Sequence, residues 1–157
     1  MEARITGGGG GIMEAANKGA FEAGGQSVGL NIQLPEEQNL NRYVTDSQTF
    51  HYFFTRKVSL AFASEVYIYY PGGFGTLDEL MEIVTLTQTR KVQNVPVVLV
   101  GREFWTPLID WFRSCLLNGE HVISPEDMDI FHIVDSAHEA HELILSLIPC
   151  TPERTPL

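Results

Sequence analysis

Two glycine-rich segments of the chain contain the residue types that bind a phosphate. The first is Gly7 to Gly11, five consecutive glycines after Thr6, and the second is Pro71 to Thr76. Glycine has no Cβ, so its backbone can adopt positive φ and approach a ligand closely. Where a glycine loop opens a helix, the first N–H groups and the helix dipole attract an anion. Both segments therefore predict anion binding, and a flexible turn is the alternative for the first.

A carboxylate follows the second glycine segment. Glu79 comes three residues after Thr76, and Glu82 lies one helical turn later on the same face. A carboxylate beside a ribose can stabilise the positive charge that develops when the C–N bond to the base is cleaved, as in glycosidases. Thr76 and Glu79 also have the spacing of a capping box, in which the glutamate only closes the start of a helix. The sequence leaves both interpretations of Glu79 open.

Basic residues are scarce, so those that are present matter. The formal net charge is −10, which argues against a broad basic face for nucleic acid. Arg56-Lys57 and Arg90-Lys91 are the only adjacent basic pairs. Arg56 could meet a phosphate or keep Glu79 ionised by pairing with it. We expect a small anionic ligand and no nucleic acid.

Other motifs are incomplete. The pattern G-x-G-x-x-G cannot be placed, because residues 12 and 78 are Ile and Asp, and no lysine follows the glycines as a P-loop requires. His138 and His141 are three residues apart, whereas the zinc motif H-E-x-x-H needs four, so a capping box from Ser136 to Glu139 is favoured. We expect no metal and no cofactor.

The composition indicates a packed, cytoplasmic protein. Hydrophobic residues make up 44% of the 157 residues, a size that suits one domain. Cys115 and Cys150 have no short spacing, which favours a reducing compartment. The apolar runs are too short to span a bilayer, and no signal peptide pattern is present. We expect one domain over residues 1–148, a disordered tail over 149–157, and no membrane association.

Strand and helix patterns alternate along the chain. Predicted strands cover residues 4–6, 26–32, 43–49, 66–70, 96–100 and 130–134, and predicted helices cover 12–23, 51–63, 77–90, 104–117 and 137–147. This alternation predicts a mostly parallel sheet with helices on both faces, which binds ligands at the carboxyl ends of its strands. The chain opens almost directly on a glycine loop, so we expect that the first strand–helix unit of such a fold is absent.

The loops resemble those of one known family. The segment from Pro71 to Glu79 is similar to the P-G-G-x-G-T-x-x-E signature of the LONELY GUY (LOG) family, and Arg56-Lys57 resembles its paired R-K. Residues 6–14 resemble its first glycine loop, where proline is common at the place of Gly10. The resemblance covers about residues 4–145.

This resemblance implies a Rossmann-like fold, a homo-oligomer and the activity of a nucleoside 5′-monophosphate phosphoribohydrolase, which releases a free base and ribose 5-phosphate. The substrate would be AMP or, where the family serves cytokinin biosynthesis, a cytokinin riboside monophosphate. The catalytic pair would be Arg56 and Glu79. The residues implied to contact the nucleotide and its phosphate are Gly8, Gly9, Gly11, Met13, Lys57, Gly72, Gly73, Gly75, Thr76 and Glu82.

Three alternatives accompany this hypothesis. Such sequences are often labelled lysine decarboxylases, but a pyridoxal enzyme needs a Schiff-base lysine, and none of Lys18, Lys57 and Lys91 has a suitable context. A non-catalytic nucleotide or molybdenum-cofactor carrier would use the same glycine loops, although Glu79 with Arg56 favours the enzyme. A degraded paralogue or truncated gene product is the third.

Two predicted helices carry more apolar surface than one sheet contact needs. The helix over 77–90 has apolar residues at positions 77, 80, 81, 83, 84 and 86, and aromatic residues occupy 50 and 52–54. Exposed apolar patches usually mark an interface, and a closed twofold is the commonest symmetry. We expect a homodimer or a higher multiple with these helices at the contact.

Overall fold

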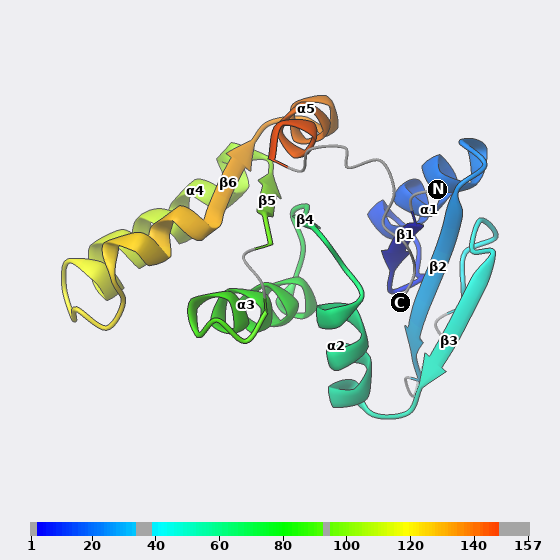
Figure 1. Ribbon diagram of the computed structural model, residues 1–157, viewed down its shortest axis with the longest axis horizontal. Coiled ribbons are helices and arrows are strands. Elements are labelled where there is room, and N and C mark those ends of the chain that lie inside the picture. The colour runs from blue at the N-terminus through cyan, green and yellow to red at the C-terminus, as the bar shows by residue number, and fades with distance from the viewer. Residues whose placement is uncertain (1–2, 34–38, 93–94, 148–157) are drawn as a thin grey trace. The chain divides into compact units, whose positions relative to one another are not determined.

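The computed structural model describes residues 3–33, 39–92 and 95–147. The chain divides into two compact units, Met1–Ser64 and Glu65–Leu157, and each has its own sheet. Within both units parallel strands alternate with helices, as Figure 1 shows. This confirms the predicted α/β class with parallel pairing. The single domain over residues 1–148 stays a prediction, and the tail over 149–157 lies outside the described residues.

The first unit is a three-stranded parallel sheet with two helices. β1 (Ala3–Thr6) leads through the first glycine segment into α1 (Ile12–Glu22), and β2 (Gln26–Ile32) follows. β3 (Asp46–Phe50) precedes α2 (Phe53–Phe62). The strand order is β1-β2-β3, so β2 is central. Hydrogen bonds join β2 to β1 on one side and to β3 on the other, and they fix the carboxyl end of β1, where the first glycine segment begins.

The core of the first unit is small and contains polar groups. Leu30 and Ile32 of β2 are buried, as is Ala20 of α1. Asn17 and Ser27 are completely buried although both are polar. Buried polar groups need hydrogen-bond partners, so this part of the core depends on directed bonds as well as on packing.

The second unit is another three-stranded parallel sheet, in the order β4-β5-β6. Its strands are β4 (Tyr67–Tyr69), β5 (Val97–Val100) and β6 (Phe131–Val134). Its helical elements are α3 (Phe74–Gln88), α4 (Arg102–Trp111), the π-helical η1 (Phe112–Leu117), the 3₁₀-helical η2 (Pro125–Ile130) and α5 (Ala137–Leu147).

The central strand β5 anchors the core of the second unit. All four of its side chains are buried, and Trp105 of α4 is fully buried beside them. The indole Nε1–H of Trp105 donates to the carbonyl of Val100 at 3.1 Å, so the buried ring has a partner for its polar atom. The predicted helix over 104–117 is found as α4 and η1, and it buries Trp105, Ile109 and Phe112.

Several boundaries differ from the predictions, and three of them bear on the site or the core. The strand predicted over 43–49 starts at Asp46, because Asn41 holds a turn in which its Oδ1 accepts from the N–H of Tyr43. The strand predicted over 66–70 is shorter and lies at an edge of its sheet, with Ile68 exposed. The helix predicted over 77–90 begins at Phe74. None of the described helices has the length and apolar character needed to cross a membrane.

Candidate functional site

The first glycine segment forms a tight turn whose shape requires glycine. Gly8 has φ of +76° and Gly11 has φ of +68°, values that other residues rarely adopt. A Cβ on Gly8 would collide with Leu40 Cδ2, so a side chain there would require Leu40 to move. Gly11 is the N-cap of α1, and no side chain caps that helix. The segment is a defined turn at a helix start.

Asparagine side chains hold this turn in place. Asn17 Oδ1 accepts from Thr6 Oγ1 at 2.7 Å and from Asn41 Nδ2 at 2.9 Å. Asn17 Nδ2 donates to Ser27 Oγ at 2.9 Å. The N–H of Gly8 donates to Thr6 Oγ1 at 2.9 Å, so Gly8 serves the turn through its shape and an internal bond. Fixed hydrogen bonds at both ends of the segment argue against the alternative of a flexible turn.

Asn17 and Asn41 are not among the residues predicted from the sequence. For Asn17 a signal existed, because it lies three positions before the buried Ala20 on the same face of α1. A polar residue on the buried face of a helix needs a specific partner. Asn41 lies in the loop before β3 and offers no comparable pattern.

Two predicted site residues lie beside the first glycine segment. Arg56 Nη1 is 3.7 Å from the position that a Cβ on Gly7 would take, and Met13 Sδ is 3.0 Å from the same point. The guanidinium of Arg56 also lies over the Phe53 ring, 5.5 Å from its centroid. Within the first unit, α2 therefore brings a positive charge to the glycine turn, and Lys57 follows it in the helix, half-buried.

The second glycine segment starts a helix earlier than predicted. Gly73 is the N-cap of α3, and its carbonyl accepts from the N–H groups of Thr76 at 3.0 Å and Leu77 at 3.1 Å. Thr76 therefore lies in the first turn of α3, and the prediction that it caps the helix is wrong. Its side chain instead fills the space in which a Cβ on Gly72 would lie.

This start changes the interpretation of Glu79. Because α3 begins at Phe74 and no side chain caps it, Glu79 lies in the second turn, too far along to close a capping box. The capping-box interpretation of Thr76 and Glu79 is wrong. Glu79 is half-buried, and its backbone carbonyl accepts from the hydroxyl of Tyr69 at 3.2 Å. A glutamate at this position is placed for a role other than starting the helix.

Glu82 lines a groove on α3. The groove has a volume of about 260 Å³, and its other lining residues are Asp78, Met81, Thr85 and Leu86. Two carboxylates there disfavour an anion but can accept hydrogen bonds from hydroxyl groups. The groove beside Glu82 therefore favours hydroxyl groups, whereas the glycine segment at the start of α3 favours an anion.

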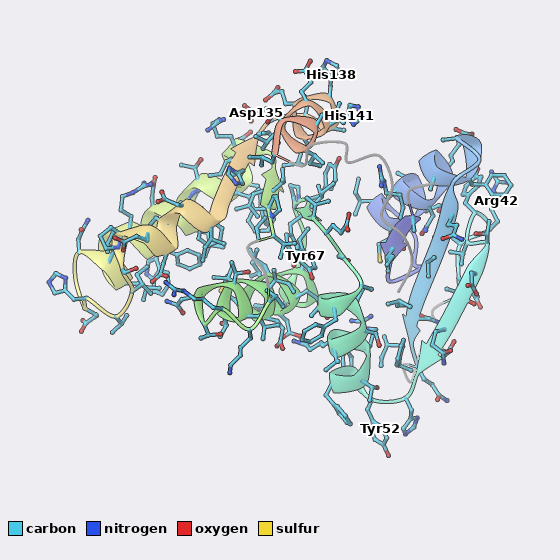
Figure 2. The ribbon with its side chains drawn as sticks, in the orientation of Figure 1. Arg42, Tyr52, Tyr67, Asp135, His138 and His141 are labelled. Carbon is cyan, nitrogen blue, oxygen red and sulfur yellow. The ribbon has the colours of Figure 1, made fainter. Side chains whose placement is uncertain are left out.

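The histidines of α5 belong to an ordinary helix start. The N–H of Glu139 donates to Ser136 Oγ at 3.1 Å, which confirms Ser136 as the cap, while Glu139 Oε2 accepts from the N–H of Asp135 at 3.1 Å instead of that of Ser136. His138 Nε2 lies 3.4 Å from Glu142 Oε1, and both side chains are exposed. Figure 2 labels His138 and His141 on α5. Among the described residues, no three His, Cys, Asp or Glu side chains are grouped to hold a metal ion.

These features define an α/β protein in which two glycine-rich loops each join a parallel strand to a helix. The sequence model of a family described as "Possible lysine decarboxylase" matches residues 13–144. The chain is 30% identical over 152 residues to the Arabidopsis thaliana cytokinin riboside 5′-monophosphate phosphoribohydrolase LOG1, covering 94% of the chain and 68% of that protein. It therefore belongs to the LONELY GUY family, to which that model corresponds.

Further relatives and solved structures agree with this assignment. A probable cytokinin riboside 5′-monophosphate phosphoribohydrolase of Oryza sativa, LOGL5, is 33% identical over 94% of the chain, which spans 59% of that relative. The molybdenum cofactor carrier protein of Chlamydomonas reinhardtii superposes with a TM-score of 0.66 at 24% identity, over 92% of this chain and 76% of that one. At this identity the likeness establishes the fold.

The hydroxyl of Tyr69 gives a measurable pH dependence. Burial, then the negative charge of Glu79 and that of Tyr67, raise the pKa of Tyr69 far above its usual value of 10.0. A raised pKa in the folded state contributes stability that is present below the unfolded pKa and is lost as the pH rises above it. The free energy of unfolding of wild type should therefore fall by about 1.4 kcal/mol more than that of Tyr69→Phe between pH 8 and 11.

Urea unfolding at the two pH values measures this difference. Tyr52→Phe is the matched control, because Tyr52 is 59% exposed and points away from the ribbon in Figure 2. Equal losses of unfolding free energy in wild type and Tyr69→Phe would contradict a Tyr69 hydroxyl that stays protonated in the folded protein.

Proposed function

We propose that this protein hydrolyses the N-glycosidic bond of a nucleoside 5′-monophosphate and releases the free base and ribose 5-phosphate. The observation that carries the proposal is Glu79, a half-buried carboxylate one turn beyond a glycine-rich helix start that it does not cap. Membership of the LONELY GUY family supports it, since the relatives named above are phosphoribohydrolases. AMP and cytokinin riboside monophosphates are the proposed substrates.

The proposed roles follow from the chemistry of each group. The helix start at Gly72, Gly73, Gly75 and Thr76 would hold the phosphate, because its N–H groups and the helix dipole favour an anion. Binding the phosphate anchors the substrate so that its remote binding energy serves the reaction. Glu79 would stabilise the positive charge on the ribose and orient the attacking water.

The remaining predicted residues complete the proposal. Glu82 would accept hydrogen bonds from the ribose hydroxyls, in keeping with its place in the groove on α3. The turn at Gly8, Gly9 and Gly11, with Met13 and Lys57, would contact the nucleotide. Arg56, which lies beside that turn, would meet the phosphate or keep Glu79 ionised.

A non-catalytic carrier of a nucleotide or of molybdenum cofactor is the alternative. Glycine loops alone would suffice for such a protein, whereas an anion carrier has no use for a carboxylate at Glu79. Mixing the purified protein with AMP and separating the products by chromatography distinguishes the two. Free adenine supports the hydrolase, and AMP that binds but is recovered intact supports the carrier.

Glu79→Gln should abolish base release while leaving AMP affinity nearly unchanged. Gln keeps the size of the side chain but cannot offer a negative charge to the transition state, so turnover should fall by about a thousandfold. Glu103→Gln is the matched control, because it makes the same substitution at an exposed position of α4 in the same unit. Wild-type turnover in Glu79→Gln would refute the catalytic role.

Arg56→Ala should lower kcat/KM for AMP by about a hundredfold, since a guanidinium that meets an anion makes a strong charge-assisted hydrogen bond. Arg113→Ala, which removes an exposed arginine paired with Asp110, should leave kcat/KM unchanged. Circular dichroism checks that both variants keep their helices. Loss of the folded signal in Arg56→Ala alone would make Arg56 a structural residue.

We also propose a homodimer or higher multiple that uses α2 and α3. The exposed apolar side chains of α2 and the residue before it are Tyr52, Phe53, Phe54, Val58 and Phe62. Light scattering should give at least about twice the 17.5 kDa of one chain. Phe54→Ser with Phe62→Ser should lower that mass, and the exposed control Val122→Ser should not. A wild-type mass of one chain at micromolar concentration would contradict the proposal.

A further inference from the structure

Asn41 binds the carbonyl groups of the first glycine segment. Its Nδ2 donates to the carbonyl oxygens of Gly8 at 3.1 Å and Gly9 at 3.0 Å, and to Asn17 Oδ1 at 2.9 Å. Its own backbone N–H donates to the Gly8 carbonyl as well, at 2.8 Å. Two consecutive carbonyls of the turn are therefore drawn toward one side chain.

Because the peptide bond is planar, the directions of these two carbonyls also fix the directions of two N–H groups. No peptide bond of the described chain is cis, and in a trans peptide the N–H points opposite to the C=O. The Gly8 carbonyl shares its peptide with the Gly9 N–H, and the Gly9 carbonyl shares its peptide with the Gly10 N–H. Both N–H groups are thus directed away from Asn41. The Gly8 N–H, by contrast, is bound inside the turn by Thr6 Oγ1.

The orientation of Asn41 is itself fixed. Its Oδ1 accepts from the N–H of Tyr43 at 3.1 Å, so the amide cannot exchange its oxygen and nitrogen without losing bonds at both ends. The partner Asn17 is held in turn, because it donates to Ser27 Oγ at 2.9 Å while the Ser27 hydroxyl donates to the Asn17 carbonyl at 3.2 Å. Because both amides are held at each end, this network has a single orientation.

We propose that Asn41 is a positioning residue that directs the N–H groups of Gly9 and Gly10 toward the phosphate of the nucleotide. The inference rests on the proposed function for the existence of that ligand, and it assigns donors that neither the family signature nor the glycine pattern distinguishes. Gly8 differs from its neighbours: its N–H is not offered to the ligand.

The donors can be observed without catalysis. Titration of the ¹⁵N-labelled wild-type protein with inorganic phosphate should shift the amide signals of Gly9 and Gly10 and leave that of Gly8 in place. The signal of Gly24, a positive-φ glycine at the end of α1, serves as an internal control. A shift at Gly8, or none at Gly9 and Gly10, overturns the assignment.

Asn41→Asp tests the side chain. The substitution keeps the shape but removes both hydrogens and places a carboxylate against three oxygen atoms, so the two peptides should rotate. Asn39→Asp adds the same charge at an exposed position two residues away. Affinity for AMP should fall about tenfold or more in Asn41→Asp, with adenosine affinity unchanged, because only AMP carries the phosphate. Asn39→Asp should bind both as wild type does.

The outcomes separate this inference from the proposed reaction. Equal losses for AMP and adenosine in Asn41→Asp would mean a merely structural residue and would overturn the inference. Where Asn41→Asp does not fold, Asn41→Ala is measured in its place, and the wild-type titration decides if neither folds. Shifts at Gly9 and Gly10 without adenine release leave the inference standing and remove the hydrolase. Adenine release without shifts at Gly9 and Gly10 would support the hydrolase and overturn the inference.

Discussion

Asn17 is completely buried, and that placement obliges each of its side-chain polar atoms to find a partner. It finds them in Thr6 at the end of β1, in Ser27 on β2 and in Asn41 in the loop before β3. One amide thus ties α1 to two strands and a loop of the first unit. Loss of both Thr6 and Asn41 as donors would leave the buried Oδ1 of Asn17 unsatisfied, which costs about 1–3 kcal/mol. The shape of the glycine turn depends on this arrangement more than on apolar packing.

The second unit fixes its glycine segment differently. There the core is apolar, with β5 buried between its neighbours and Trp105 beside it. The helix start is set by the Gly73 carbonyl, which accepts two N–H groups, and no side chain takes part in the cap. Glu79 therefore takes no part in capping the helix, although its spacing from Thr76 suggests a capping box. The two glycine loops resemble each other in sequence, yet one is shaped by side-chain amides and the other by its own backbone.

Much of the fold could be predicted, because it depends on local patterns. The strand over Gln26–Ile32 and the helix over Ala137–Leu147 have the predicted bounds, since an apolar pattern and clear stop signals coincide at their ends. The start of α3 could not be predicted, because Thr76 is a better N-cap by residue type than Gly73 and only the backbone decides between them. The position of Arg56 beside Gly7 and the amides of Asn17 and Asn41 depend on residues far apart in the sequence. No local pattern reports such contacts.

The crowding at Gly72 ties two positions of the second loop to each other. The volume that a side chain at position 72 would need is occupied by the hydroxyl and methyl groups of Thr76. Because even the Cβ of residue 76 lies within 2.8 Å of that volume, a sequence with alanine at 72 fits this helix start only with glycine at 76, and it then loses the hydroxyl from the first turn of α3. The two sites should vary together among members of the family. A relative that carries a side chain at 72 and keeps threonine at 76 has a rebuilt helix start.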